Sequence, residues 1–194
     1  TPTDGSVTAN KIGTDAVTTA KINANAVTSA KMFSGFANGI TELDQYRLTS
    51  DLTNNASNYI TSNFERVDNA AFSKIGTGMS QSSGTFTFPS TGLYRIHVVA
   101  HIYIPSGNDG AAGVDTYFSD DDFSSTQQLA TAWAGSTAGG QWYGTHSSEC
   151  FVNVTNSSTN KIRFATNSMA AAILVGSTSI NQTTFSFIRL GDSQ

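Results

Sequence analysis

Cysteine is nearly absent from this sequence: Cys150 is the only one among 194 residues. No disulfide can therefore form within the chain, and its stability has to come from packing and association. Cys150 stands beside Phe151, Val152 and Val154, which are the neighbours expected in an apolar strand. We therefore expect Cys150 to be a buried structural thiol and not a catalytic nucleophile.

Charge is the second shortage. Asp, Glu, Lys and Arg make up only 12% of the residues, which is about half of the usual share in soluble globular domains. Glycine, serine, threonine and asparagine take their place, which favours a β-rich extracellular or virion protein over a cytosolic enzyme. The net charge of −4 indicates no general attraction to nucleic acid or to an anionic membrane.

Long apolar runs are also missing. The longest, from Met169 to Val175, has the length of a strand, whereas a membrane-spanning helix needs about 20 apolar residues. The opening segment, Thr1 to Gly5, has neither the charged nor the apolar region of a signal peptide, and it begins inside a repeat without an initiator methionine. We expect no membrane insertion, and a chain that is processed or that forms the end of a longer protein.

Sequence motifs for the common enzyme chemistries are absent as well. The chain has no Walker loop and no G-x-G-x-x-G, H-E-x-x-H, C-x-x-C or G-x-S-x-G motif. Serine follows His146, but no orienting acid stands at a recognisable spacing. We therefore expect no catalytic residue, no cofactor and no enzymatic activity. A carboxylate pair for glycoside hydrolysis stays open, because a sequence does not show how far apart two carboxylates lie.

A ten-residue repeat occupies the N-terminal region, and its most regular positions are Val7, Val17 and Val27. The other repeated positions are Thr8, Thr18 and Thr28, then Lys11, Lys21 and Lys31, then Ile12, Ile22 and Met32. A period this strict indicates copies of one structural unit. Three copies contain too few apolar side chains for a core of their own. We therefore expect an extended β shaft over residues 1–38, in which the three valines align identical chains side by side.

After a predicted linker over residues 39–44, the sequence has the pattern of short strands. In the clearest of them, apolar residues from Tyr94 to Ile104 alternate with polar ones such as Arg95, which is typical of a strand with one buried face. The further candidates are residues 46–52, 60–67, 114–119, 128–134, 149–155, 161–166, 170–175 and 183–190. Such a series of strands without an amphipathic helix predicts an all-β sandwich or jelly roll over residues 45–194.

Three stretches resemble the C1q/TNF-like heads. The segment Gly84-Thr-Phe-Thr-Phe-Pro-Ser-Thr-Gly-Leu-Tyr94 is similar to the family's G-x-F-x-x-P-x-x-G-x-Y, residues 60–75 resemble the segment before it, and Thr184-Phe-Ser-Phe-Ile-Arg-Leu190 resembles the closing T-F-S-G-F-L-L strand. The chain departs from the family at Phe187, which replaces a glycine, and at Thr159-Asn160, which replaces Gly-Asp. The resemblance covers roughly residues 45–190 and implies a jelly roll that forms homotrimers.

The repeat resembles the G-A-V-T-x-x-K-I decapeptides that are common in bacteriophage tail-fibre and related virion proteins. Its combination with a C1q-like head is similar to fibre proteins of marine phages, and implies a homotrimeric head on a trimeric stem. By this resemblance, the strands of Tyr94 and Phe185 pack near the threefold axis. The aromatic surface is larger than one face of a β-sandwich usually needs, because it includes Phe88, Tyr94, Phe185 and Phe187. We expect Tyr94, Phe185 and Phe187 at the trimer interface; the alternative is an ordinary intrachain core.

Two clusters of polar residues have both a metal-binding and a plain interpretation. His97 and His101 lie on one face of one strand but about 13 Å apart, too far to share a metal ion; in a trimer, each could form a ring with its symmetry mates. Asp120-Asp-Asp122, with Asp115 nearby, is the only acidic cluster, and loop carboxylates suit Ca²⁺. The spacing is not that of an EF-hand. We expect a polar strand face, a solvated loop and no metal site.

Aromatic residues around one glycine-rich loop are the best candidates for ligand binding. Trp133 precedes the loop of residues 135–144, which contains Trp142 and Tyr143, and His146 follows it. Aromatic rings on polar loops suit both stacking on sugar rings and protein contacts. The alternative is that Trp133 belongs to the core and that Trp142 and Tyr143 only anchor the loop.

Together these features predict a non-enzymatic fibre or appendage protein on the surface of a virion. We expect the N-terminal repeat to join other virion proteins, and three identical heads to bind a host-surface glycan or protein through several weak contacts at once. The alternatives are a purely structural trimerisation or decoration module, a glycan depolymerase, and a secreted cellular adhesin.

Overall fold

The computed structural model of the chain describes residues 39–53, 58–105, 109–137 and 139–194, together with a few isolated positions before residue 39. The chain divides into two compact units, residues 1–38 and residues 39–194. Val7, Val17 and Val27, and with them the predicted β shaft, lie outside the described residues. We call the second unit the head.

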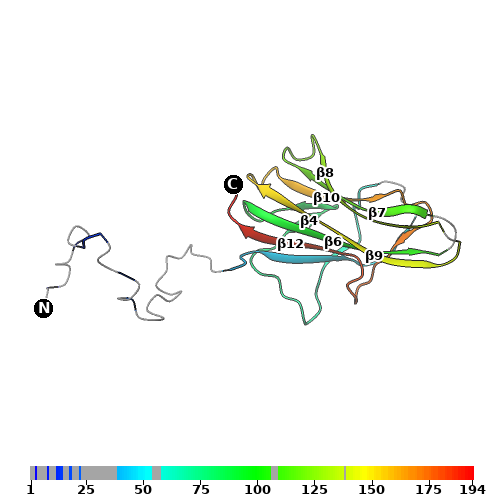
Figure 1. The fold of residues 1–194 in the computed structure, drawn as a ribbon, viewed down its shortest axis with the longest axis horizontal. Coiled ribbons are helices and arrows are strands. Elements are labelled where there is room, and N and C mark those ends of the chain that lie inside the picture. The colour runs from blue at the N-terminus through cyan, green and yellow to red at the C-terminus, as the bar shows by residue number, and fades with distance from the viewer. Residues whose placement is uncertain are drawn as a thin grey trace. The chain divides into compact units, whose positions relative to one another are not determined.

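The described part of the head consists of β-strands joined by turns and loops (Figure 1). The strands are β1 (Leu43–Leu48), β2 (Leu52–Thr53), β3 (Phe64–Arg66), β4 (Ser80–Ser82), β5 (Thr85–Thr87), β6 (Gly92–Ile104), β7 (Asp109–Ser119), β8 (Gln127–Ser136), β9 (Trp142–Val154), β10 (Lys161–Asn167), β11 (Ile173–Leu174) and β12 (Thr184–Gly191). Among the residues that the structure describes, no helix is long and apolar enough to cross a membrane.

The predicted linker over residues 39–44 is partly wrong, because β1 begins inside it. Leu43 pairs with Ile188 of β12, and the side chain of Asp44 is buried. Strand pairing with β12 therefore extends to the last two residues of the segment that the sequence pattern assigned to a linker.

The strands form two antiparallel sheets that pack on one hydrophobic core (Figure 1). Sheet I has the order β2-β11-β6-β12-β1-β3, and β9 pairs along the other side of β6. Sheet II has the order β4-β5-β10-β7-β8. The C-terminal strand β12 lies between β1 and β6, so sheet I is complete only when the last strand of the chain is in place. The predicted all-β, two-sheet architecture is confirmed.

Strand β6 shows how sheet I divides its two faces. The alternate residues from Tyr94 to Ile104 are all buried, whereas those from Leu93 to Tyr103 are half-buried on the opposite face. Successive side chains of a strand point to opposite sides of the sheet. One face of β6 therefore enters the core and the other faces outward, as the alternation in the sequence predicted.

Aromatic rings form the centre of the core. Phe86 lies 5.4 Å from Phe164 and 5.3 Å from Phe187, and Phe164 lies 4.4 Å from Phe185, measured between ring centroids. Tyr94, Phe185 and Phe187 are at most 1% exposed within the single chain. The prediction that these three side chains form a trimer interface is therefore corrected: they belong to the intrachain core. Burial of each such side chain stabilises the head by about 1.5–3 kcal/mol.

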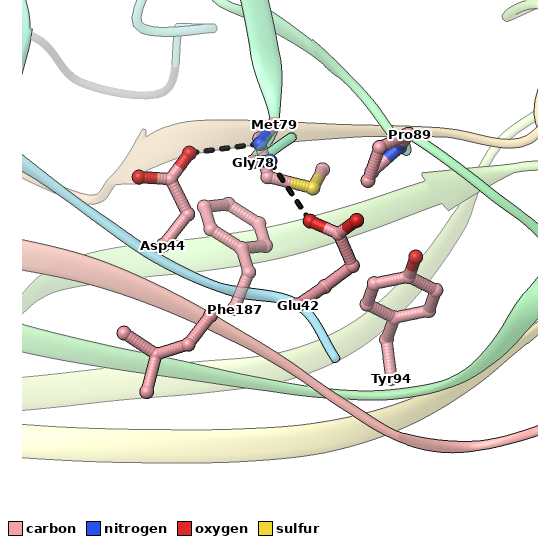
Figure 2. A pocket seen from close by; sticks show the side chains of 8 residues that line it. Glu42, Asp44, Gly78, Met79, Pro89, Tyr94 and Phe187 are labelled. Atoms are coloured by element: carbon pink, nitrogen blue, oxygen red, sulfur yellow. Dashed lines mark hydrogen bonds between the residues drawn. The ribbon is translucent and has the colours of Figure 1, made fainter. Parts of the chain in front are cut away.

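Two acidic residues at the start of β1 hold the segment that leads into β4. Figure 2 shows Oε2 of Glu42 accepting a hydrogen bond from the backbone N–H of Gly78, and Oδ2 of Asp44 accepting one from Met79, both at 2.8 Å. Arg66 donates to both carboxylate oxygens of Asp44, at 2.9 and 3.0 Å. Side chains fill the crevice around these residues and leave no room for a ligand. The role of this cluster is therefore structural.

Candidate binding surfaces of the head

Asp115 lies on the outward face of sheet II, in the strand next to the edge strand β8. Its neighbour in β7, Val114, is buried in the core, so the alternation of the strand turns Asp115 to the other face. The Oδ1 atom of Asp115 accepts hydrogen bonds from the Thr131 hydroxyl at 2.8 Å and from the indole N–H of Trp133 at 3.3 Å, and Oδ2 accepts one from the Asn167 amide at 2.6 Å. These neighbours leave Asp115 only 2% exposed.

Gly113 creates the space for the Trp133 ring. The two residues pair across β7 and β8. A Cβ atom on residue 113 would lie 2.4 Å from Cδ1 of Trp133 and 2.3 Å from the carbonyl oxygen of Ala132. The indole therefore lies across a position without a side chain, where its N–H reaches Asp115.

A hollow of about 280 Å³ opens beside Asp115. The residues that line it are Asn58, Tyr59, Asp115, Tyr117, Ala165, Thr166 and Asn167. Tyr59 forms a backbone bridge with Ala165, and its ring meets that of Tyr117 edge-on at 5.4 Å. Tyr59 stays 39% exposed. Burial, followed by the charge of Asp115, raises the pKa of Tyr117, so its hydroxyl is protonated at neutral pH.

A second, more open hollow of about 360 Å³ lies where β8, at the end of sheet II, contacts β9, at the edge of sheet I. Thr131, Trp133, His146 and Ser147 line it. Trp142 stacks beside His146, with 6.3 Å between ring centroids and 25° between planes. Of the four predicted ligand-binding residues, the structure thus brings Trp133, Trp142 and His146 to one edge of the sandwich. Trp133 is half exposed and is not part of the core.

Tyr143, the fourth predicted residue, lies on a different face. Its ring stacks on that of Tyr103 in β6, with centroids 4.3 Å apart and 11° between planes. The sequence prediction placed Trp142 and Tyr143 together on a loop, but β9 already begins at Trp142. In a strand, consecutive side chains point in opposite directions, which separates Tyr143 from the other three.

The outward face of sheet I carries exposed aromatic side chains along β9. Tyr143 is 60% and Phe151 is 56% exposed, and these residues pair with Tyr103 and Arg95 of β6. Val99 of β6 is half-buried on the same face, between these two pairs. Polar Thr145, Ser147 and Glu149 of β9 separate the two exposed rings, and aromatic side chains are enriched in protein–protein interfaces.

His97 and His101 share the outward face of β6, as their spacing predicted. His97 pairs with Glu149, and Nδ1 of His101 lies 2.7 Å from the hydroxyl oxygen of Thr145. Among the described residues, no group of three or more His, Cys, Asp or Glu side chains could hold a metal ion. A histidine ring around a threefold axis stays a prediction.

The acidic cluster separates into two parts. Asp115 lies within sheet II, whereas Asp120, Asp121 and Asp122 are exposed after β7. The carboxylate of Asp121 accepts hydrogen bonds from the backbone N–H and the hydroxyl of Ser125, both at 2.8 Å, and these bonds lower the pKa of Asp121. Asp121 therefore closes a turn, in agreement with a solvated loop.

The sequence prediction missed most of the partners of Asp115. A signal was present for Tyr117, because Asp115 and Tyr117 alternate with apolar or small residues and so share one face of β7. No local pattern connects Tyr59 or Asn167 with that face. They reach it only through the pairing of β10 with β7 and the bridge between Tyr59 and Ala165.

Comparison with known proteins identifies the fold. No family model matches the sequence, and no curated protein is significantly similar to it. Among solved structures, the Eiger TNF of S. frugiperda has a TM-score of 0.59 at 10% identity, covering 78% of this chain and 94% of that one. Murine APRIL at pH 8.0 has a TM-score of 0.53 at 12% identity, covering 77% and 98%, and at pH 5.0 a TM-score of 0.51 at 14% identity with the same coverage. The head therefore has a TNF-like jelly-roll fold, as predicted.

Proposed function

We propose that this chain is a structural protein of a virion fibre or appendage, and that it assembles into a homotrimer whose heads bind a host surface. The observation that carries the proposal is the outward face of sheet I, where β9 exposes Tyr143 and Phe151 along a strand of 13 residues. Burial of these side chains between subunits would stabilise the assembly by about 1.5–3 kcal/mol each.

The proposed interface uses the two strands that the sequence resemblance placed near the threefold axis, but the opposite faces of those strands. In β12, Phe185 and Phe187 are buried, whereas Ser186 and Ile188 are half-buried on the outward side. In β6, the outward residues pair with Tyr143 and Phe151 of β9. Three heads that meet through these outward faces leave the intrachain aromatic core unchanged.

The role in a virion rests on the N-terminal repeat. Val7, Val17 and Val27 recur at a constant interval of ten, and the repeat resembles decapeptides of phage tail fibres. In this proposal the repeat aligns three chains in a shaft and joins other virion proteins. The heads then stand together at one end, where several weak contacts with a host envelope add up through effective concentration.

The mass of the full chain in solution tests the assembly. We expect size-exclusion chromatography with light scattering to give three times the 20.4 kDa mass of one chain. A monomeric chain over a wide concentration range would overturn the homotrimer. Adsorption of the labelled trimer to a panel of bacterial cells then tests recognition: a stable trimer that adsorbs to none of them retains only a structural role.

A further inference from the structure

The hollow beside Asp115 stays open in the proposed assembly. It lies on the outward face of sheet II, among residues of β7 and β10 together with Asn58 and Tyr59. Since both sheets pack on a common core, the outward faces of sheets I and II lie on opposite sides of the sandwich. Contacts through sheet I therefore leave one such hollow accessible on each of the three heads.

The polar groups of the hollow are held in place before any ligand arrives. An ionised carboxylate offers about four acceptor positions. Asp115 uses them for the hydroxyl of Thr131, the indole of Trp133, the amide of Asn167 and, at 3.5 Å, the hydroxyl of Tyr117. Asp115 therefore acts as a positioning residue, which orients the amide and the phenol that line the hollow.

The ring of Tyr59 is held in a similar way. The guanidinium of Arg163 lies 5.6 Å from its centroid and 3.8 Å from that of Phe123, and Nε of Arg163 donates to the Thr85 hydroxyl at 2.9 Å. Together with the edge-on contact to Tyr117, these neighbours fix a partly exposed aromatic ring at the rim. A rigid, pre-positioned site loses little conformational freedom on binding.

The chemistry of the hollow matches a sugar. A pyranose has an apolar C–H face that stacks on an aromatic ring, and hydroxyls that both donate and accept hydrogen bonds. Tyr59 offers the ring, Tyr117 a hydroxyl and Asn167 an amide, whereas the buried hydroxyl of Thr166 is bonded to the backbone of Asn58 and holds that residue at the rim. Among the described residues that line the hollow, the one charged side chain is the Asp115 carboxylate. Its negative charge disfavours anionic ligands.

We propose that the hollow beside Asp115 binds a neutral saccharide, with Tyr59 stacking on the sugar ring and with Tyr117 and Asn167 contacting its hydroxyls. This proposal names the ligand class for the recognition role and rests on it. The volume of about 280 Å³ is near the lower end of the range for ligand pockets, about 300–1,000 Å³, and suits one or two sugar rings. We expect a Kd on the order of 1 mM for a single sugar, which three heads strengthen through avidity.

Saturation-transfer difference NMR on the full chain tests the proposal. The neutral probes are the methyl glycosides of D-glucose, D-galactose, D-mannose, L-rhamnose and N-acetyl-D-glucosamine, each at about ten times the expected Kd. The anionic probes are methyl glucuronide and N-acetylneuraminic acid. We expect saturable transfer to at least one neutral probe and a weaker effect with both anions. Binding of none of the neutral probes, or of the anions in preference, would overturn the proposal.

Substitutions in the hollow locate the site. We expect Tyr59→Ala to lower the affinity for the sugar by at least about tenfold. Tyr59→Phe should retain most of the affinity, because it keeps the ring. Tyr117→Phe removes one hydroxyl and should weaken binding by about threefold to tenfold. The matched control is Ile180→Ala, which shortens an exposed apolar side chain outside the hollow and should leave binding unchanged.

These results separate the saccharide site from the proposed function. If Tyr59→Ala keeps the oligomeric mass and the Tm of the parent protein and still binds the sugar with the same affinity, the assignment of the hollow is wrong, even if the trimer adsorbs to cells. If Tyr59→Ala does not fold, Tyr117→Phe decides the same question. Sugar binding by a chain that is monomeric or does not adsorb to cells would support the site and contradict the proposed function.

Discussion

The indole N–H of Trp133 lies 3.3 Å from Oδ1 of Asp115, so that a half-exposed tryptophan and a buried carboxylate form one unit across β8 and β7. A buried carboxylate is tolerated only when hydrogen bonds replace the water that it has lost. Thr131 and Asn167 complete this set of donors. The same contacts therefore stabilise sheet II and shape the hollow beside it.

Removal of the Asp115 carboxylate should destabilise the head. We expect Asp115→Ala to lower the free energy of unfolding by about 2–4 kcal/mol, because several buried or half-buried donors lose their acceptor at once. Urea denaturation followed by circular dichroism measures this change. The control is Asp120→Ala on the exposed turn, which should change stability by less than about 0.5 kcal/mol. Equal effects of the two substitutions would contradict the central role of Asp115.

A side chain at Gly84 should also destabilise the head. Gly84 has a φ of +78°, and a Cβ there would lie 1.9 Å from the carbonyl oxygen of Ile60. We expect Gly84→Ala to cost about 2–4 kcal/mol of unfolding free energy, since the left-handed conformation and the backbone clash act together. Gly139→Ala is the matched control, because no atom lies within 4 Å of the added Cβ. A Tm unchanged by Gly84→Ala would show that the two segments do not approach each other this closely.

Charged residues on the outward face of sheet I should dissociate the proposed trimer. The double substitution Tyr143→Asp with Phe151→Asp would place unpaired charges in the interface, where their desolvation is costly. We expect light scattering to show monomers, while circular dichroism shows an unchanged fold because both positions are exposed within the chain. Ile180→Asp, also at an exposed apolar residue, should leave the mass unchanged. A trimer that persists in the double variant would show that the interface does not use this face.

Cys150 should react slowly with alkylating reagents. Burial raises the pKa of its thiol to about 11, from an ordinary value of 9.0, with a smaller contribution from the charge of Glu149. Only the thiolate reacts, so at pH 8 we expect iodoacetamide to modify the folded chain about 100-fold more slowly than the urea-unfolded chain. A rate equal to that of the unfolded chain would show that the thiol is not shielded.

The same shift predicts how stability depends on pH. Between pH 9 and about 11 the folded state keeps the Cys150 proton, which the unfolded state has already lost. The unfolded state therefore binds fewer protons in this window, and stability falls as pH rises through it. In Cys150→Ser, the part of this decrease that arises from the thiol should disappear. An identical decrease in the two proteins would assign it to other groups.

Much of the fold could be predicted because strand alternation is a local property. The apolar residues from Tyr94 to Ile104 and the polar ones between them identified β6 and its buried face. The same alternation also showed that Phe185 and Phe187 are buried, but not against which partner. The structure places both within the core of one chain, so the interface predicted for them was wrong although their burial was correct.

The candidate site was less predictable, because its residues come from separate parts of the chain. Trp142 and His146 lie near Trp133 because β9 contacts β8. Tyr143 points to the opposite face because β9 begins at Trp142. A shift of one residue in the register of a strand turns each of its side chains to the other face. Loop and strand boundaries therefore decide which aromatic residues can act together.

Composition and spacing along the chain were sufficient to predict the all-β class, the absence of an intrachain disulfide and the ten-residue period of the first unit. The hydrogen bonds of Asp115 with Trp133, Thr131 and Asn167, and its place beside Tyr59, could be seen only in the folded chain. Those contacts depend on how β7, β8 and β10 pair, and the side chains meet only when the sheet has formed. Local patterns specify which way a side chain points, whereas the register between distant strands specifies what it touches.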